Sequence, residues 1–323
     1  MTMGKYVIGI DIGGTAVKLG IVHLKGQLIH KWSIPTNTKN NGATIVEDIW
    51  HSITDQIRKL KIEKQYIIGI GAGVAGFIDS KNGVVHESVN IGWKNFPLAE
   101  ELYNLSGLPV FIENDANVAA LGERWKGAGQ GADQMIVMTL GTGVGGGIIA
   151  KGDILSGANG MAGEIGHFII DKENGLLCNC GKYGCLETIA SATGIVKHAL
   201  RWAKQNPDSR LAKTAAGEDA LSAKDVFQLA KEGDEHAGQI VKQAADALGY
   251  TIASLGIFCN PSVVLIGGGV SMAGDFLLDQ VKDAFRKYAL PRVYDICDIK
   301  QCELGNDAGI FGGAYLVKKQ RGA

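Results

Sequence analysis

Four residues with metal-binding side chains fall within one short stretch of the chain. His167 is followed by Cys178, Cys180 and Cys185 in a segment rich in glycine and asparagine. One imidazole and three thiolates are the ligands of a closed tetrahedral Zn²⁺ site, which keeps no open position for catalysis. A disulfide is the alternative, but Cys178 and Cys180 are poorly placed to pair, and cytosolic thiols stay reduced. The spacing therefore predicts a structural zinc site.

Three glycine-rich segments, at residues 11–15, 141–147 and 267–269, each follow an apolar run. Glycines at the end of a strand let backbone N–H groups approach phosphate oxygens, and a threonine adds a hydroxyl donor. Asp11 in the first segment could hold Mg²⁺ directly or through water. The third segment suits a flat purine or a phosphate. A plain turn is the alternative for the first and third segments.

Residues 141–146 and 71–76 also match G-x-G-x-x-G, the pattern of dinucleotide-binding sites. That pattern opens a helix within a βαβ unit. Here residues 144–150 continue as a strand, and residues 77–79 read as loop or strand. We therefore reject a nicotinamide or flavin cofactor.

Carboxylates and amides gather at residues 113–115 and on both sides of the cysteine segment, at Glu164 and Glu187. Phosphoryl transfer to an alcohol needs a carboxylate that accepts the hydroxyl proton, and a sugar needs several such groups to bind its hydroxyls. Because Glu164 and Glu187 flank the predicted metal loop, the metal would fix where both point. The alternatives are solvated surface charges and, for Asp115, the N-cap of a helix at residues 116–125.

The apolar pattern predicts two α/β halves, each of which opens with a strand, a glycine turn and an antiparallel strand. In the first half we expect strands at residues 5–10, 17–24, 27–34, 66–72 and 109–112, and helices at 43–61 and 98–105. In the second half we expect strands at residues 134–140, 144–151 and 262–266, and helices at 194–204, 225–231, 234–258, 276–288 and 307–318. Ser222 and Asp225 resemble a capping box.

This order of elements predicts two domains. Residues 1–118 form a small N-terminal α/β domain, and residues 119–306 form a large C-terminal α/β domain that contains the metal loop at residues 164–187. We expect the last helix, within residues 307–323, to pack back on the first domain.

The composition excludes several classes of protein. Of the 323 residues, 46% are hydrophobic and 20% are charged, so the chain can bury a core and is not disordered. A net charge of −1 gives no global attraction to nucleic acid or to an anionic membrane. One uncharged stretch, residues 247–274, is interrupted by Asn260 and Pro261 and is not a membrane span. With no targeting segment visible, we expect a cytoplasmic protein without nucleic-acid or membrane partners.

Together these motifs resemble the ROK family (repressors, open reading frames and kinases), within the actin-like ATPase superfamily, over nearly the whole chain. Residues 11–15 are similar to the first phosphate motif of the family, residues 141–147 to the second, and residues 267–270 to its adenosine motif. Residues 113–117 match the segment whose aspartate is the catalytic base. Residues 164–187 match the zinc signature of the family closely.

The resemblance implies an α/β protein with the two-domain actin-like ATPase (ribonuclease H-like) fold and an active-site cleft between the domains. Residues 90–93 and 185–188 are most like those of the family's bacterial ATP-dependent glucokinases. That likeness implies transfer of the ATP γ-phosphate to the 6-hydroxyl of glucose, the first step of glucose use in glycolysis. Asp115 would be the catalytic base. The implied cofactors are ATP, Mg²⁺ and a structural Zn²⁺, and the implied assembly is a homodimer or a higher homo-oligomer.

The resemblance also assigns binding residues. The glucose hydroxyls would be held by Gly76, Asn90, Asn114, Asp115, Glu164, His167 and Glu187. ATP and Mg²⁺ would be held by Asp11, Gly13, Gly14, Thr15, Lys18, Gly141, Thr142, Gly143, Gly267, Gly268 and Gly269. Zinc would be held by His167, Cys178, Cys180 and Cys185. His167 would then be shared, with one ring nitrogen on zinc and the other on a sugar hydroxyl.

Three other functions are considered. A ROK kinase for another hexose or an N-acetylhexosamine (mannose, fructose, N-acetylglucosamine or N-acetylmannosamine) would need the same core, because a few pocket contacts of about 1–3 kcal/mol each separate such substrates. A non-catalytic sugar-sensing ROK regulator would carry an N-terminal helix-turn-helix, for which a first strand at Lys5 leaves no room, and it would need no base such as Asp115. A catalytically silent ATPase of the wider superfamily would not need the zinc signature.

Overall fold

The computed structural model describes residues 5–217 and 220–322, and the chain divides into two compact units. Unit 1 comprises Met1–Gly131, Gly147–Ala162 and Glu303–Ala323, and unit 2 comprises Ala132–Gly146 and Gly163–Cys302. The outer limits of the predicted domains, at residues 1 and 323, lie outside the described residues, and the predicted boundary between residues 118 and 119 stays a prediction. No helix within the described ranges is both long and apolar enough to cross a membrane.

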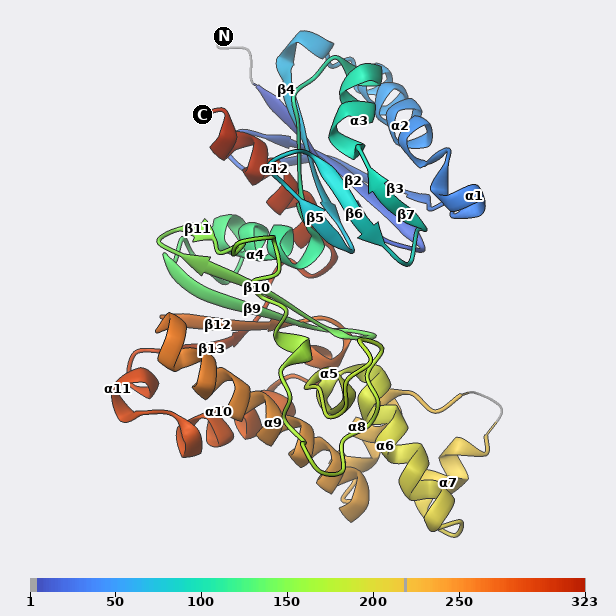
Figure 1. Cartoon of the computed structure of the whole chain (residues 1–323), viewed down its shortest axis with the longest axis vertical. Coiled ribbons are helices and arrows are strands. Elements are labelled where there is room, and N and C mark those ends of the chain that lie inside the picture. Colours follow the sequence, from blue (N-terminus) through green and yellow to red (C-terminus); the bar gives the residue numbers. More distant parts are fainter. Residues whose placement is uncertain (1–4, 218–219, 323) are drawn as a thin grey trace. The chain divides into compact units, whose positions relative to one another are not determined.

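Unit 1 is built on a five-stranded sheet with the order β3-β2-β1-β4-β8 (Figure 1). β1 pairs antiparallel with β2, which pairs antiparallel with β3, and β1 also pairs parallel with β4. The strands are β1 (Tyr6–Ile12), β2 (Ala16–His23), β3 (Leu28–Pro35), β4 (Ile67–Val74) and β8 (Val110–Asn114). The helices of this unit are α1 (Lys39–Gly42), α2 (Ile45–Lys59), α3 (Leu98–Ser106), α4 (Asp115–Lys126) and α12 (Ala308–Gln320).

Alternate residues of β1 point to opposite faces of this sheet, as the pleat of a strand requires. Ile8 and Ile10 belong to the core that includes the buried residues of α2 and α3, whereas Val7 belongs to the core that includes α12. Figure 1 shows α2 and α3 on one face of the sheet and α12 on the other. A Cβ on Gly71 would lie 1.9 Å from the carbonyl oxygen of Gly313, so the packing of α12 requires glycine at this position.

A small three-stranded sheet with the order β5-β6-β7 completes unit 1. The sequence expects only loop or strand at the first of these segments and does not predict the other two. Strands of three to five residues are too short to show a clear period of two. The three strands are β5 (Phe77–Asp79), β6 (Val84–Ser88) and β7 (Trp93–Phe96).

The second five-stranded sheet has the order β11-β10-β9-β12-β13, and the division between the units falls inside β10. β12 pairs parallel with both β9 and β13, and all five of its residues are buried. The strands are β9 (Gln134–Leu140), β10 (Val144–Ala150), β11 (Asp153–Ile154), β12 (Val263–Gly267) and β13 (Asp298–Gln301). The helices of unit 2 are α5 (Glu187–Ala190), α6 (Ala192–Gln205), α7 (Arg210–Ala215), α8 (Ala223–Lys231), α9 (Glu235–Cys259), α10 (Asp275–Tyr288) and α11 (Pro291–Tyr294).

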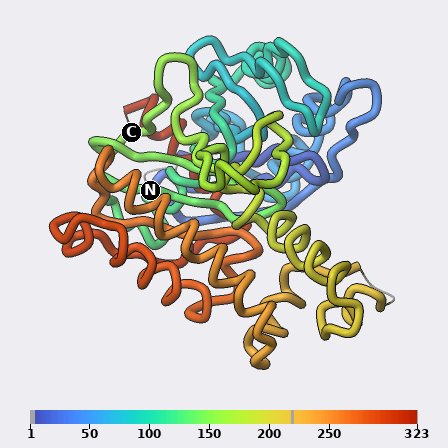
Figure 2. The backbone as a smooth tube through the Cα atoms, turned by 60° about the horizontal axis from the view of Figure 1, so that its bottom comes forward, coloured from blue at the N-terminus to red at the C-terminus, as the bar shows by residue number. Residues whose placement is uncertain are grey.

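The long helix α9 lies side by side with α10 (Figures 1 and 2). A Cβ on Gly249 would lie 2.6 Å from the backbone nitrogen of Phe285, so a glycine allows this close approach. The predicted capping box at the start of α8 is confirmed, because Ser222 and Asp225 bond each other's backbone N–H groups. The predicted strands and helices are confirmed as well, with ends that differ by at most two residues.

Candidate active site and metal centre

The four predicted metal-binding residues lie together in unit 2. Their ligand atoms, one each from His167, Cys178, Cys180 and Cys185, all lie within 4.8 Å of one another. His167 Nδ1 is 3.6 Å from Cys178 Sγ, and the sulfurs of Cys180 and Cys185 are also 3.6 Å apart. Tetrahedral Zn–S and Zn–N bonds of about 2.3 and 2.0 Å place neighbouring ligand atoms roughly 3.5–3.8 Å apart. The cluster therefore fits a zinc ion, and its three cysteines are free thiols.

Two glycines shape the loop that carries these ligands. Gly181 and Gly184 have φ values of +84° and +75°, a backbone region that favours glycine. The Cys178 N–H donates to the Lys182 carbonyl at 2.8 Å, which closes a tight turn around the first two thiols. The backbone of the loop thus helps to bring the cysteines together.

The three thiols hold their protons with different strength. Burial raises the pKa of Cys178, the Glu187 carboxylate raises it further, and burial also raises the pKa of Cys185. At Cys180 burial opposes ionisation, but hydrogen bonds from the Lys182 N–H and from the neighbouring thiols outweigh it and lower the pKa. Zinc binding needs all three cysteines as thiolates, so it would release their protons.

Glu187 connects the cysteine cluster to the second glycine turn. Its Oε1 accepts a hydrogen bond from Cys178 Sγ at 3.1 Å, and its Oε2 accepts one from the Val144 N–H at 3.3 Å. A Cβ on Gly143 would meet this carboxylate, so a larger residue there would displace the Glu187 side chain. A zinc-bound Cys178 is a thiolate and has no proton to donate, which would leave Oε1 of Glu187 for another donor.

His167 presents its two ring nitrogens to different groups. Nδ1 faces Cys178 at 3.6 Å, and Nε2 faces the Oε2 atom of the exposed Glu164 at 3.8 Å. This arrangement leaves Nε2 on the side of the carboxylate and away from the thiols. It is the geometry that sharing of one imidazole between a metal and a second ligand requires.

The second and third glycine segments pack on each other in unit 2. Gly268 has a φ of +83°, and a Cβ there would lie 2.5 Å from the Leu140 carbonyl oxygen, just before Gly141. The Gly141 carbonyl accepts the N–H of Ala192 at 2.9 Å, at the start of α6. The backbone around both turns is therefore fixed, while the Thr142 side chain stays exposed.

A cavity of about 460 Å³ lies beside the third glycine segment. Gly269 and Val270 line it together with Phe227 and Lys231 of α8, and Lys231 Nζ donates to the Ala273 carbonyl at 3.3 Å. The sequence prediction missed this wall because α8 lies far from the glycine segment along the chain. The only signal in the sequence for this part of the cavity was the mixture of lysines and apolar residues in α8.

In unit 1, Asp11 near the end of β1 lies directly opposite Lys18 on β2. Lys18 Nζ is 3.3 Å from Asp11 Oδ2, and the two side chains are 36% and 23% exposed. Lys18 also donates to Asn306 Oδ1 at 3.2 Å. Both predicted charged groups therefore lie beside the first glycine turn, where a phosphate and its Mg²⁺ can reach them.

Two residues hold the first glycine turn from outside it. A Cβ on Gly14 would lie 2.9 Å from the Cβ of Asn90, so the turn contacts a predicted sugar-binding residue. Thr36 Oγ1 donates to the Gly13 carbonyl at 2.6 Å, and the Thr36 N–H donates to the Thr15 carbonyl at 3.0 Å. The sequence prediction missed Thr36, which no motif singles out.

Asn114 forms the corner between β8 and α4. Its Oδ1 accepts the N–H groups of Ala116 and Asn117 at 2.9 and 3.3 Å, and its Nδ2 donates to the Gly76 carbonyl at 3.1 Å. The alternative that made Asp115 the N-cap is wrong, because Asn114 holds that position and Asp115 is the first helical residue. Asp115 is half-buried, directly after this corner.

Glu113 supports the same corner from inside. It is 5% exposed; its Oε2 accepts from Ser80 Oγ at 2.7 Å, and its Oε1 accepts from the Asn114 N–H and from Asn117 Nδ2 at 2.8 and 3.2 Å. Through these three hydrogen bonds, the Glu113 carboxylate fixes the backbone that precedes Asp115. Ser80 is a second residue that the sequence prediction missed.

The predicted site residues are shared between the units. Unit 1 holds Asp11, Gly13, Gly14, Thr15, Lys18, Gly76, Asn90, Asn114 and Asp115. Unit 2 holds Gly141, Thr142, Gly143, Glu164, His167, Cys178, Cys180, Cys185, Glu187, Gly267, Gly268 and Gly269. Within each unit the structure brings them into the contacts described above.

Comparison with known proteins gives consistent results. The model of the ROK family matches residues 7–320. A glucokinase of Halalkalibacterium halodurans is 48% identical over 316 residues, which is 98% of this chain and 96% of that protein. The ROK hexokinase of Thermus thermophilus has a similar crystal structure, with a TM-score of 0.84 and 31% identity, over 98% of this chain and 99% of that one.

A second solved structure holds ligands. It is the ROK family glucokinase of Streptomyces griseus in complex with glucose and AMPPNP, with a TM-score of 0.79 and 34% identity, over 97% of this chain and 99% of that one. Because these structures match along the whole chain, the predicted actin-like ATPase fold is confirmed.

Proposed function

Because the chain belongs to the ROK family, we propose that it is an ATP-dependent glucokinase, which transfers the γ-phosphoryl group of ATP to the 6-hydroxyl of glucose. The observation that carries this proposal is the full-length similarity to glucokinases, together with a half-buried Asp115 that follows a corner fixed by Asn114. Sequence likeness favours glucose over other hexoses and N-acetylhexosamines.

Asp115 is the base in this proposal. Its carboxylate accepts the proton of the sugar 6-hydroxyl as the hydroxyl oxygen bonds to the γ-phosphorus, while the bond from that phosphorus to the β–γ bridging oxygen breaks and ADP leaves. Glu113 positions the residue through the backbone. Further sugar hydroxyls bind Gly76, Asn90, Asn114, Glu164, His167 and Glu187 in this proposal.

The nucleotide enters as Mg·ATP. Asp11 binds the Mg²⁺, Lys18 neutralises phosphate charge, and the backbone N–H groups of the glycine turns bind phosphate oxygens, with Thr15 and Thr142 as hydroxyl donors. The adenosine lies against Gly267, Gly268 and Gly269, beside the cavity that Gly269 and α8 line.

Zinc is held by His167, Cys178, Cys180 and Cys185 in this proposal. When bound, it supplies a rigid frame for the loop and performs no chemistry on the substrate, because all four positions are occupied by protein. Glu164 and Glu187 then keep fixed directions from the two ends of the loop. A homodimer or larger homo-oligomer and a cytoplasmic location stay predictions.

ADP release with Mg·ATP across a panel of hexoses and N-acetylhexosamines tests the proposal. We expect strong turnover on glucose and weak turnover on the others. A preference for another sugar would keep the fold and the role of Asp115 but overturn the substrate. No turnover on any sugar, by folded protein with zinc bound, would overturn the kinase function.

A further inference from the structure

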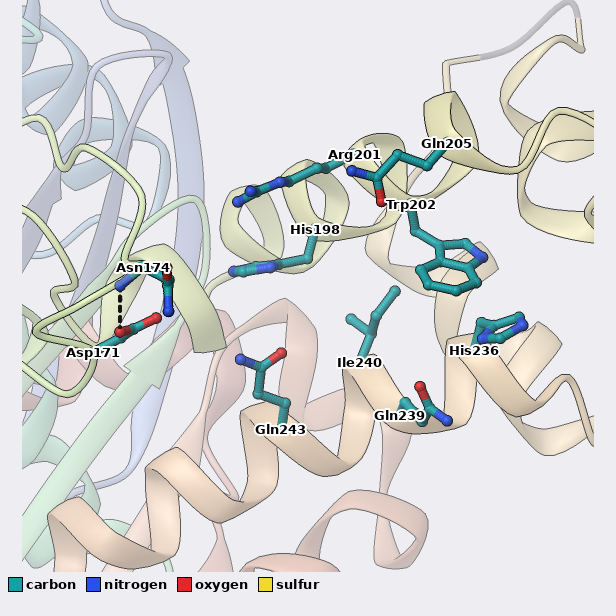
Figure 3. Close-up of a pocket in the computed structure, with 10 residues that line it drawn as sticks. All are labelled: Asp171, Asn174, His198, Arg201, Trp202, Gln205, His236, Gln239, Ile240 and Gln243. Carbon is teal, nitrogen blue, oxygen red and sulfur yellow. Dashed lines mark hydrogen bonds between the residues drawn. The ribbon is translucent and has the colours of Figure 1, made fainter.

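A cavity of about 380 Å³ in unit 2 is lined by side chains that the proposed function does not use (Figure 3). It lies between helices α6 and α9 and the loop that follows His167. Figure 3 shows His198 and Arg201 of α6 pointing toward the loop residues Asp171 and Asn174, while Trp202 lies near His236 of α9. The volume is in the range of small-molecule sites, about 300–1,000 Å³.

The lining of this cavity is polar and incompletely bonded. Nine of its ten residues carry a polar side-chain atom, Ile240 being the exception. His198 Nε2, Trp202 Nε1 and His236 Nδ1 are buried and have no hydrogen-bond partner among the described residues. A buried polar atom without a partner costs about 1–3 kcal/mol. Of the five such side-chain atoms in the described ranges, these three belong to residues that line one cavity.

The donors and acceptors of the lining define the chemistry of a ligand. Burial lowers the pKa of His198, so its imidazole is neutral at pH 7, and it donates to the backbone carbonyl of Thr188. Because Nε2 is the unpartnered atom, Nδ1 makes that bond and Nε2 is left as an acceptor. The Trp202 indole can only donate. Asp171 accepts backbone N–H groups with Oδ1, which leaves Oδ2.

Hydroxyl groups meet these demands better than ions do. A hydroxyl donates to Asp171 Oδ2, and the amides of Asn174, Gln205, Gln239 and Gln243 bond hydroxyls in either sense. A simple cation would face Arg201, and a simple anion would face Asp171. A phosphate on a polyhydroxylated ligand could still bind Arg201.

We propose that this cavity is a second carbohydrate site, which binds a sugar or a sugar phosphate through its hydroxyls. Its residues are not among those proposed for the phosphoryl acceptor. Arg201 would favour a phosphorylated ligand, such as the product of a sugar kinase, over a free sugar.

The walls of the cavity lead directly to the metal loop. Thr188, which accepts from His198, follows Glu187 in α5, and its Oγ1 donates to the Cys185 carbonyl at 2.7 Å. On the other side, the Asp171 N–H donates to the Gly184 carbonyl at 3.1 Å. A ligand in the cavity would therefore shift the position of Glu187. Because Glu187 is a proposed glucose-binding residue, the KM for glucose would change as well; this consequence rests on the proposed function.

Nuclear magnetic resonance of the indole N–H groups of the full-length, zinc-loaded protein tests the site. Trp202→Phe assigns the Trp202 resonance. We expect this resonance to shift saturably with glucose or glucose 6-phosphate, and Gln243→Leu to weaken the response roughly tenfold, the effect of one lost hydrogen bond. Ser254→Ala, a half-buried position on α9 outside the cavity, is the control and leaves the response unchanged.

The other outcomes are decisive. An equal shift with inorganic phosphate alone would identify an anion site and overturn the carbohydrate assignment. No shift with either sugar, or a shift that Gln243→Leu and Arg201→Ala leave unchanged, would overturn the site itself. Arg201→Ala that weakens glucose 6-phosphate but not glucose assigns the phosphorylated ligand. Failure of the glucokinase proposal shows separately, as absence of ADP release.

Kinetics tests the coupling on the same variants. We expect the second ligand to change the apparent KM for glucose more in the wild type than in Arg201→Ala or Gln243→Leu, whose basal turnover stays normal, because competition by product at the acceptor site is common to all three proteins. A KM that responds to the ligand identically in all three proteins would contradict the coupling.

Discussion

Two glycine turns of related sequence are held in different ways in the two units. The turn in unit 1 lies beside the charged pair Asp11 and Lys18 and is braced by the hydroxyl of Thr36. The turn at residues 141–143 in unit 2 contains no charged residue, and the N–H that follows it is bonded by Glu187. The first turn has charge and support close by, whereas the second depends on a loop more than forty residues later in the sequence.

The two glycine turns are therefore positioned by different parts of the chain. The first turn needs no metal-held element, because Thr36 and the strands β1 and β2 position it. The second turn depends on Glu187, which contacts a ligand of the cysteine cluster. Loss of zinc should therefore disturb the groups of unit 2 and leave the chemistry of Asp11 and Asp115 in unit 1 intact.

Asp115→Asn gives the largest expected effect. The amide cannot accept the hydroxyl proton, so kcat should fall about 10²–10⁴-fold, the contribution of a general base. The KM for glucose and the zinc content should stay near those of the wild type. Steady-state kinetics and metal analysis measure both, with the exposed Asp55→Asn on α2 as the control. A kcat within twofold of the wild type would remove Asp115 from the role of base.

Cys180→Ala removes one ligand of the zinc site that holds the loop of unit 2. We expect loss of zinc and a rise of roughly 10–100-fold in the KM for glucose, the effect of losing groups that orient a site. Cys259→Ala, a thiol outside the cluster, is the matched control and keeps both zinc and KM. A zinc-free Cys180→Ala protein with a normal KM would show that the metal does not position Glu164 and Glu187.

The charge at the first turn should matter more than the hydroxyl at the second. Asp11→Asn should lower kcat/KM for Mg·ATP about tenfold, because a neutral amide replaces the charged oxygen that holds the Mg²⁺ or its water, a loss of about 1.5 kcal/mol. Thr142→Val should lower it about twofold, as expected for a neutral bond of about 0.5 kcal/mol. Equal losses in the two variants would contradict the contrast between the turns.

The smallest expected effect is on the stability of helix α8, which lines the cavity beside the third glycine segment. Ser222→Ala should cost about 1 kcal/mol of unfolding free energy by removing the N-cap. Hydrogen bonds from Ser222 lower the pKa of Asp225 below its ordinary value of 3.8. The contribution of Asp225 is therefore complete above pH 3.8 and is lost as the pH falls through the lowered value. Urea unfolding at pH 7 and pH 3 measures it. Asp225→Asn should reduce the difference between the two pH values, to which the other carboxylates also contribute; an unchanged difference would contradict the assignment.

The sequence predicted what depends on local spacing. The cysteine ligands, the glycine turns and the long helices follow from residue type and period, and each appears in the structure within a few residues of its expected place. The sequence could not predict Thr36, Ser80 or Phe227, because their roles arise from tertiary contacts between segments far apart in the chain. The cap at Asn114 was misplaced by one residue, since both Asn and Asp are good N-caps.

Stepwise removal of zinc from the wild-type enzyme, with the zinc content and the kinetics measured on the same samples, tests the central contrast most directly. We predict that the KM for glucose rises as zinc is lost, that the KM for Mg·ATP changes less, and that zinc restores both. A folded, zinc-depleted enzyme whose KM for glucose stays constant would contradict the claim that a metal-held loop positions the sugar-binding groups of unit 2.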